Sequence, residues 1–177
     1  MKSLHEAKAE GLALHALDPS ARLLVNETAT KTALAKLWKD ASYVYIAAHA
    51  GRTDLPYLSA LVLAAPKDDV TPDADLLDVT DIRAADLRRC GLVVLSGCSS
   101  GLPYIAARGA APSLGDAFLD AGAAAVIHTF WDVADDDARR IGSAFVERWK
   151  KEKDDEIRAL CYARRAELRG EKGIRHP

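Results

Sequence analysis

Apolar and polar positions along the chain follow two alternating patterns, one with helical spacing and one typical of buried strands. Amphipathic stretches are interrupted by short apolar runs, and this alternation predicts parallel strands joined by crossover helices, an α/β fold. Helices are expected over 3–17, 31–39, 82–90, 114–121, 134–151 and 155–169. Strands or strand-like runs are expected over 21–25, 43–49, 58–65, 92–98 and 123–130.

Two of these runs end in a reactive side chain. Residues 43–49 read YVYIAAH and end at His49, and residues 92–98 read LVVLSGC and end at Cys98. If the two strands are adjacent and parallel, an imidazole and a thiol meet at the sheet edge where α/β proteins bind ligands. A free thiol has a pKa of about 8.5, so a cysteine nucleophile needs a base beside it. The sequence therefore predicts a Cys98–His49 dyad.

Length, composition and net charge limit the classes of protein to which the chain can belong. The chain has 177 residues, 49% of them hydrophobic, so it can bury one core, and a single domain over 1–177 is expected. A formal net charge of −2 gives no electrostatic reason to expect nucleic acid or an anionic membrane as a partner. No apolar stretch approaches the length of a membrane span and the N-terminus does not resemble a signal, so a cytoplasmic protein is expected.

Cysteine and histidine spacing argues against a metal site. The three cysteines are odd in number and show no zinc or disulfide pattern, so no metal and no cofactor are predicted. Cys90 and Cys161 fall on helical patterns and are predicted to be packing residues. His128 lies in an apolar run and is predicted to be a core histidine with satisfied hydrogen bonds. Gly97 and Gly101 follow a strand, but the glycine pattern of phosphate-binding loops is absent.

Five separated motifs resemble the CHAT domain and occur in the order of that family. They are His49, SGCSSG at 96–101, SLGDAF at 113–118, AGA at 121–123 and FWDV at 130–133. The resemblance covers roughly residues 20–177, and the SGC and WDV segments are also similar to the separase protease domain. It implies a caspase/gingipain-like three-layer α/β/α sandwich with a mostly parallel central sheet. It also implies a cysteine endopeptidase in which the backbone amides of Ala50 and Cys98 hold the oxyanion.

The resemblance also implies partners. CHAT modules often stand beside tetratricopeptide repeats, so a protein or peptide substrate and a tetratricopeptide-repeat or other regulatory partner are expected. Trp131 follows an apolar run that should be parallel to the Cys98 strand, so its ring is expected to wall a substrate groove, or else to pack in the core. Asp132, Asp135 and Asp137 are expected to bind a basic substrate segment or to stabilise the next helix terminus, which is a better explanation than magnesium binding.

Arg139 bears on substrate choice. It stands eight residues after Trp131, where separases have an aspartate thought to hold the arginine of the substrate. A basic side chain there predicts that the residue before the scissile bond is acidic or neutral and not Arg or Lys. The alternative is that Arg139 is a solvated helix residue.

Departures from the family pattern leave a second function open. Ala50 stands where the family usually has glycine, and alanine resists a positive φ angle. Family members usually continue past a segment like 173–177 and carry a further strand and helix before the part matching residue 4, so the domain is expected to be incomplete at both edges. A sheet edge left open in this way predicts self-association. The alternative to a peptidase is therefore a catalytically weak or inactive CHAT-like interaction or assembly module.

Overall fold

The computed structural model describes residues 5–52, 59–65, 74–96, 104–106, 109–111, 113–130 and 133–169. The chain divides into two compact units, one of Leu24–Asp132 and one of Met1–Leu23 with Val133–Pro177. We call them the sheet unit and the helical unit. Because one domain can contain two compact units, a single domain over 1–177 stays a prediction.

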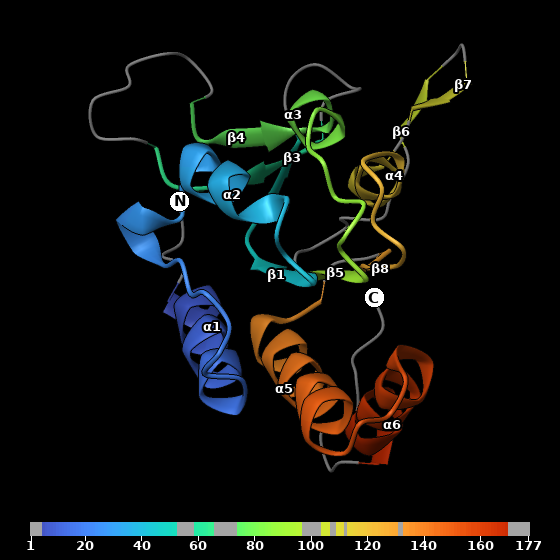
Figure 1. The fold of residues 1–177 in the computed structure, drawn as a ribbon. Helices are drawn as coiled ribbons and strands as arrows, with labels where there is room; N and C mark the ends of the chain where they lie inside the picture. Colours follow the sequence, from blue (N-terminus) through green and yellow to red (C-terminus); the bar gives the residue numbers. More distant parts are fainter. Residues whose placement is uncertain are drawn as a thin grey trace. The chain divides into compact units, whose positions relative to one another are not determined.

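The sheet unit is built on a parallel three-stranded sheet with the strand order β1-β5-β8 (Figure 1). β1 spans Tyr43–Ala47, β5 spans Leu92–Ser96 and β8 spans Val126–Ile127. The register pairs Ala47 of β1 with Ser96 of β5, and Val94 of β5 with Ile127 of β8. Together with the helices below, this sheet confirms the predicted α/β fold and the predicted parallel pairing of the His49 and Cys98 strands.

The other described strands of the sheet unit form two antiparallel sheets. β2 (Ala50–Arg52), β3 (Ser59–Val62) and β4 (Leu76–Asp78) form a second sheet in that order. β6 (Tyr104–Ala106) pairs with β7 (Gly109–Ala111). The sequence did not predict β4, because three residues are too few for an alternating pattern to stand out.

Side-chain caps start two helices of the sheet unit, α2 and α4, where the sequence predicts. The Thr30 hydroxyl accepts a 3.2 Å hydrogen bond from the Ala33 amide at the start of α2 (Lys31–Trp38). The Ser113 hydroxyl accepts a 3.1 Å hydrogen bond from the Asp116 amide at the start of α4 (Leu114–Asp120). α4 ends at Gly122, whose φ of 106° is open to glycine but strained for other residues.

The core of the sheet unit lies between the parallel sheet and the helices α2, α3 (Val79–Arg83) and α4. Alternate strand residues point into it, including Val44, Ile46 and Ala48 from β1 and Val93 and Leu95 from β5. The rings of Trp38 on α2 and Phe118 on α4 meet there at a centroid distance of 6.0 Å. The opposite set of strand residues, Tyr43 and Tyr45 of β1 with Leu92 and Val94 of β5, therefore points to the other face of the sheet.

The helical unit contains α1 (His5–Leu17), α5 (Asp135–Lys151) and α6 (Glu156–Arg169), as the sequence predicts. α5 packs against both α1 and α6. Ala159 and Ala163 form the fully buried side of α6, one turn apart. Arg140 of α5 donates a 2.6 Å hydrogen bond to Glu167 of α6 and also pairs with Asp137. None of the described helices has both the length and the apolar character needed to cross a bilayer.

Three predicted elements are wrong in whole or in part. The strand over 21–25 does not form, because the Thr28 side chain bonds both the amide and the carbonyl of Val25 and closes the short helix η1 (Asn26–Thr28). The helix over 82–90 is displaced, because Asp78 caps α3 and starts it at Val79. The strand over 123–130 shortens to β8, because the amide of Ala123 bonds the carbonyl of Phe118 at the end of α4 and the amide of Ala124 bonds the carbonyl of Cys90, before β5 begins.

Candidate active site

His49 lies just beyond the carboxyl end of β1, at the point where the chain passes from the parallel sheet into β2. The buried side chain of Ala48 belongs to the core, and the backbone carbonyl of His49 accepts a 2.9 Å hydrogen bond from the amide of Val62 on β3. The His49 side chain is half-buried. The backbone of His49 is therefore fixed by the buried Ala48 before it and by the hydrogen bond from β3. This suits a residue whose imidazole must keep one position.

The amide of Ala50 is directed away from the β2–β3 ladder. β2 and β3 pair Ala50 with Leu61, and the bond from Val62 to His49 shows that Ala50 and Leu61 form a non-hydrogen-bonded pair. In such a pair both backbone polar groups point to the outer side of each strand. β2 is an edge strand among the described strands, so the pairing of its sheet does not use the Ala50 amide.

Alanine at position 50 fits this conformation. Ala50 belongs to β2, whose extended backbone suits any L-residue, so no positive φ angle and no glycine are needed there. Its side chain packs against the core cluster of the sheet unit. The resistance of alanine to a positive φ angle therefore carries no cost at position 50 in this structure.

Cys98, Trp131 and Asp132 lie outside the described residues, as does the side chain of Asp135. The last described residue of the cysteine-bearing run is Ser96, paired with Ala47 at the end of β1. His49 stands two residues beyond Ala47 in the sequence, and Cys98 stands two residues beyond Ser96. A close contact between their side chains remains a prediction.

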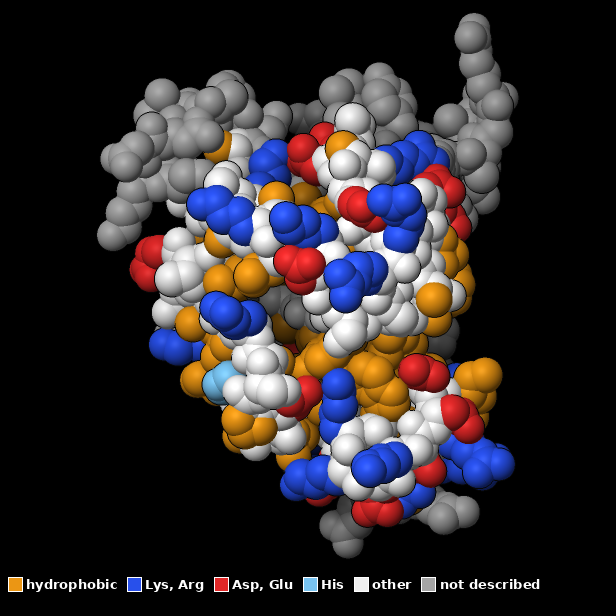
Figure 2. Space-filling model, viewed as in Figure 1, with side chains coloured by type: hydrophobic (Ala, Val, Ile, Leu, Met, Phe, Trp, Pro, Cys, Tyr) orange, Lys and Arg blue, Asp and Glu red, His pale blue; other side chains and the backbone are white. Residues whose placement is uncertain are grey.

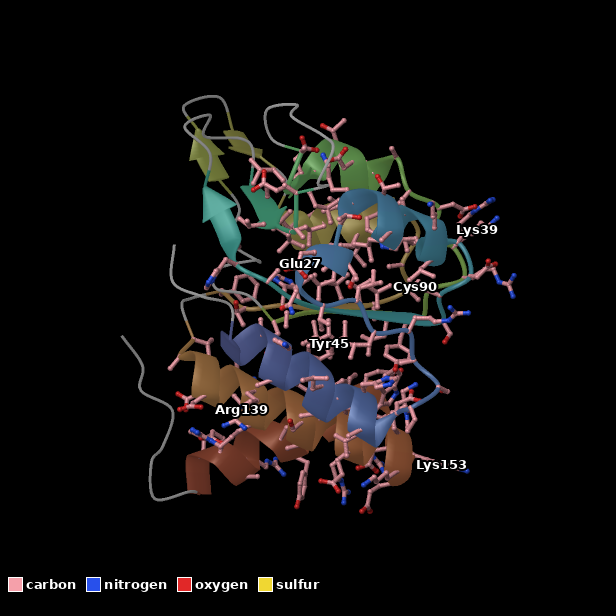
Figure 3. The ribbon with its side chains drawn as sticks, turned by 90° about the vertical axis from the view of Figure 1, so that its left-hand side faces the viewer. Glu27, Lys39, Tyr45, Cys90, Arg139 and Lys153 are labelled. Carbon is pink, nitrogen blue, oxygen red and sulfur yellow. The ribbon has the colours of Figure 1, made fainter. Side chains whose placement is uncertain are left out.

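The acidic stretch after Trp131 opens α5. Asp136 and Asp137 lie in the first turn of that helix, as predicted, and pair with Arg139 and Arg140 one turn later. The Arg139 side chain is 40% exposed, and its Nη2 donates a 3.1 Å hydrogen bond to Asp136. Figure 3 shows Arg139 on its helix. Arg139 is therefore partly neutralised, which fits a helix surface residue; its role in substrate choice stays a prediction.

His128 differs from the core histidine expected from the sequence. Its ring packs against Gly115 at the start of α4 and lies 5.0 Å from the ring of Phe130, but its buried Nδ1 has no hydrogen-bond partner in the structure. Burial lowers the pKa of His128, and the nearby Asp116 carboxylate opposes this shift. The hydrogen bonds that it accepts from Ser113 lower the pKa of Asp116 itself.

The remaining cysteines have opposite environments. Cys90, labelled in Figure 3, is 1% exposed, and its thiol donates a 3.3 Å hydrogen bond to the carbonyl of Leu92. Burial raises the pKa of the Cys90 thiol, which disfavours the reactive thiolate, so its predicted packing role is confirmed. Cys161 is exposed on α6, so the prediction that it packs in the interior is wrong.

No group of three or more metal-ligating side chains gathers within the described ranges of the chain. The described geometry is that of two parallel strand ends, one of which leads into His49 and the other toward Cys98. Such an edge suits nucleophilic chemistry, in which a thiol and its base come from neighbouring strands.

Comparison with known proteins identifies the family of the chain. No curated protein matches the chain. The model of the CHAT domain family matches residues 1–177, the whole length of the sequence. The chain therefore belongs to the CHAT domain family, which is related to caspase-like proteases.

Proposed function

We propose that this protein is a cysteine endopeptidase that cleaves a protein partner, with Cys98 as nucleophile and His49 as general base. The observation that carries the proposal is the parallel pairing of β1 with β5, which sets Ala47 opposite Ser96 two residues before each of the proposed catalytic residues. Membership of the CHAT family supports the same chemistry.

The alternation of side chains supports the dyad as well. Val44, Ile46 and Ala48 point into the core from β1, and Val93 and Leu95 do so from β5. Counting on along each strand assigns His49 and Cys98 to the opposite face, and both to the same row. His128 belongs by the same count to the core face, as its contact with Gly115 of α4 agrees, so it does not compete with His49 as the base.

Acylation follows from these assignments. His49 takes the proton of the Cys98 thiol, and the thiolate attacks the carbonyl carbon of the scissile peptide bond. The carbonyl oxygen becomes an oxyanion that accepts hydrogen bonds from the amides of Ala50 and Cys98, and the first of these amides is directed away from the β2–β3 ladder. As the tetrahedral intermediate collapses, the protonated His49 gives its proton to the leaving amine, and a thioester to Cys98 remains.

Deacylation reverses these roles. A water molecule gives a proton to His49 and attacks the thioester carbonyl, and the second intermediate expels the Cys98 sulfur, which regains the proton. The products are a carboxylic acid and the free enzyme. No cofactor is required for either half of the reaction.

The proposal also assigns the residues that recognise the substrate. Trp131 walls the groove, with Asp132 and Asp135 near the start of α5, and Arg139 disfavours a basic residue before the scissile bond. A library of peptides that vary at this position tests the point. Cleavage after acidic or neutral residues is expected. Cleavage after Arg or Lys would show that Arg139 does not exclude basic residues at this position of the substrate.

A thiol-directed peptidyl electrophile tests the dyad. Because Cys161 is exposed, the experiment uses the full chain with Cys161→Ser as its reference, while buried Cys90 is left in place. The probe should label the reference protein and should not label a further Cys98→Ala variant. In a separate variant of the reference protein that keeps Cys98, His49→Ala should slow labelling by about a hundredfold or more, the usual contribution of a positioned base. Equal labelling rates with and without His49 would instead favour the catalytically weak interaction module.

A further inference from the structure

The outer side of α6 combines exposed apolar and basic side chains. In a helix of 3.6 residues per turn, Ile157, Cys161 and Leu168 fall on one side, opposite the buried Ala159 and Ala163. Ile157 is 77% exposed and Leu168 is 57% exposed, the two highest values among the exposed large hydrophobic residues of the described chain. We call the surface formed by Ile157, Arg158, Cys161, Arg164, Arg165 and Leu168 the outer α6 face.

Three arginines stand along this apolar stripe. Arg164 and Arg165 are exposed and lie between Cys161 and Leu168, and no acidic side chain of the described residues pairs with either of them. The guanidinium of Arg158 forms an ion pair with Asp155, just before the helix, at 3.4 Å. Figure 2 shows hydrophobic, basic and acidic side chains next to one another at the surface of this helix. Exposed apolar residues therefore share one side of α6 with arginines, two of which have no acidic partner among the described residues.

We propose that the outer α6 face binds an acidic amphipathic helix of a partner protein. α6 has 14 residues, which gives a contact about 21 Å long, enough for three to four turns of a second helix. An apolar stripe on the partner would cover Ile157, Cys161 and Leu168. Asp or Glu residues beside that stripe would pair with Arg164 and Arg165, whose guanidinium groups bind carboxylates in bidentate fashion.

The charges argue against the other occupants of such a surface. A second copy of the chain would bring arginine against arginine near the middle of two antiparallel α6 helices, which is repulsive. An anionic membrane attracts basic helices that carry large hydrophobic faces, but the outer α6 face has only Ile157 and Leu168 as large apolar residues. A partner helix is the occupant that fits both the apolar and the basic residues.

A displayed peptide library tests the proposal. The peptides are amphipathic helices with a fixed apolar stripe and with flanking positions that vary among Glu, Lys and Ser. The bait is the full chain with Cys98→Ala, which cannot cleave the peptides by the proposed mechanism and leaves α6 unchanged. Selection should enrich Glu over Lys at the flanking positions, and the selected peptides should bind the free chain in titrations.

Matched variants identify the surface. Ile157→Ser with Leu168→Ser, and separately Arg164→Glu with Arg165→Glu, should each weaken binding about tenfold or more. The arginine variant should also turn the library preference from Glu to Lys. The control is Leu119→Ser with Arg88→Glu, which changes an exposed apolar and an exposed basic residue of the sheet unit and should leave binding unchanged. Thermal melting of every variant establishes that it is folded.

Several results would overturn the proposal. No enrichment, enrichment of Lys, or binding that none of the α6 variants weakens would each reject it. Binding to phosphatidylserine-containing vesicles in place of peptides would make the face a membrane surface, and a dimer lost in the Ile157/Leu168 variant would make it a self-association surface. Because the bait lacks Cys98, none of these results depends on the proposed peptidase.

Discussion

The amide of Val62 on β3 donates a 2.9 Å hydrogen bond to the carbonyl of His49. The antiparallel sheet thereby fixes the backbone of the residue that lies just beyond strand β1 of the parallel sheet. Replacement of Val62 by proline removes the donor and one bond of the ladder. We expect the free energy of unfolding to fall by about 1–3 kcal/mol and labelling of Cys98 by the peptidyl electrophile to slow. Val62→Thr keeps the amide and serves as control. Unchanged labelling by a folded Val62→Pro protein would show that His49 does not need this bond.

Ala50 allows a sharper test of the oxyanion site. Proline at this position removes an amide that the β2–β3 ladder does not use, so the melting temperature should change little. Turnover should drop by about a hundredfold, the usual effect of losing one oxyanion donor. Ala50→Gly retains the amide and should retain activity. If Ala50→Pro turned over substrate at the wild-type rate, the oxyanion would have to be held elsewhere.

His128 should make stability depend on pH. Its pKa in the folded protein is lowered by burial, while in the unfolded chain it has the ordinary value near 6.5, so the unfolded state takes up the proton first. The free energy of unfolding should therefore fall as the pH drops below about 6.5 and should level off below the folded pKa. The facing Asp116 titrates at lower pH. Melting temperatures of wild type and His128→Gln at pH 7.5 and 5.5 measure the effect, and an equal loss in both proteins would contradict it.

Reactivity with a thiol reagent should distinguish Cys161 from Cys90. Exposed Cys161 should react with a small disulfide reagent in the native protein, whereas Cys90 should react only after denaturation, because it is buried and its pKa is raised. Mass spectrometry of the modified peptides identifies each site. Cys161→Ser should remove one rapidly reacting thiol and leave the slow one. Rapid reaction of Cys90 in the native state would mean that the sheet unit opens at that position.

Trp131→Ala distinguishes a groove residue from a core residue. On the groove hypothesis, peptide turnover should fall by a larger factor than stability does, because the ring contacts substrate. On the core hypothesis, the change should cost about 3–5 kcal/mol and unfold the domain. Turnover and melting temperature measured on this one variant decide between the two, with Trp38→Ala as an example of a buried tryptophan.

Local signals in the sequence account for what was predicted correctly. Thr30 and Ser113 satisfy amides within their own helices, so their positions mark helix starts without knowledge of the rest of the chain. The runs that become β1 and β5 are apolar throughout, which is enough to indicate buried parallel strands. The family motifs then associate those strands with a candidate site at His49 and Cys98.

The features that were missed depend on contacts that a pattern does not contain. Val25 looks like a strand residue, but Thr28 bonds both of its backbone polar groups. The orientation of the Ala50 amide follows from its pairing with Leu61, and the unsatisfied nitrogen of His128 follows from packing against Gly115. The contact between Val25 and Thr28 is local, whereas the other two depend on Leu61 and Gly115, which the tertiary fold brings into contact with Ala50 and His128.

Two arginines of α5 form ion pairs near the two ends of α6. Arg140 holds Glu167 near the end of α6, while Arg148 binds Asp154 before α6 and lies 4.4 Å from the ring centre of Tyr162. Two attachments so far apart prevent α6 from rolling about its own axis, and the small side chains of Ala159 and Ala163 keep it close to α5. The outer α6 face is therefore preformed, so the proposed binding of a partner helix would cost little conformational entropy of α6 itself.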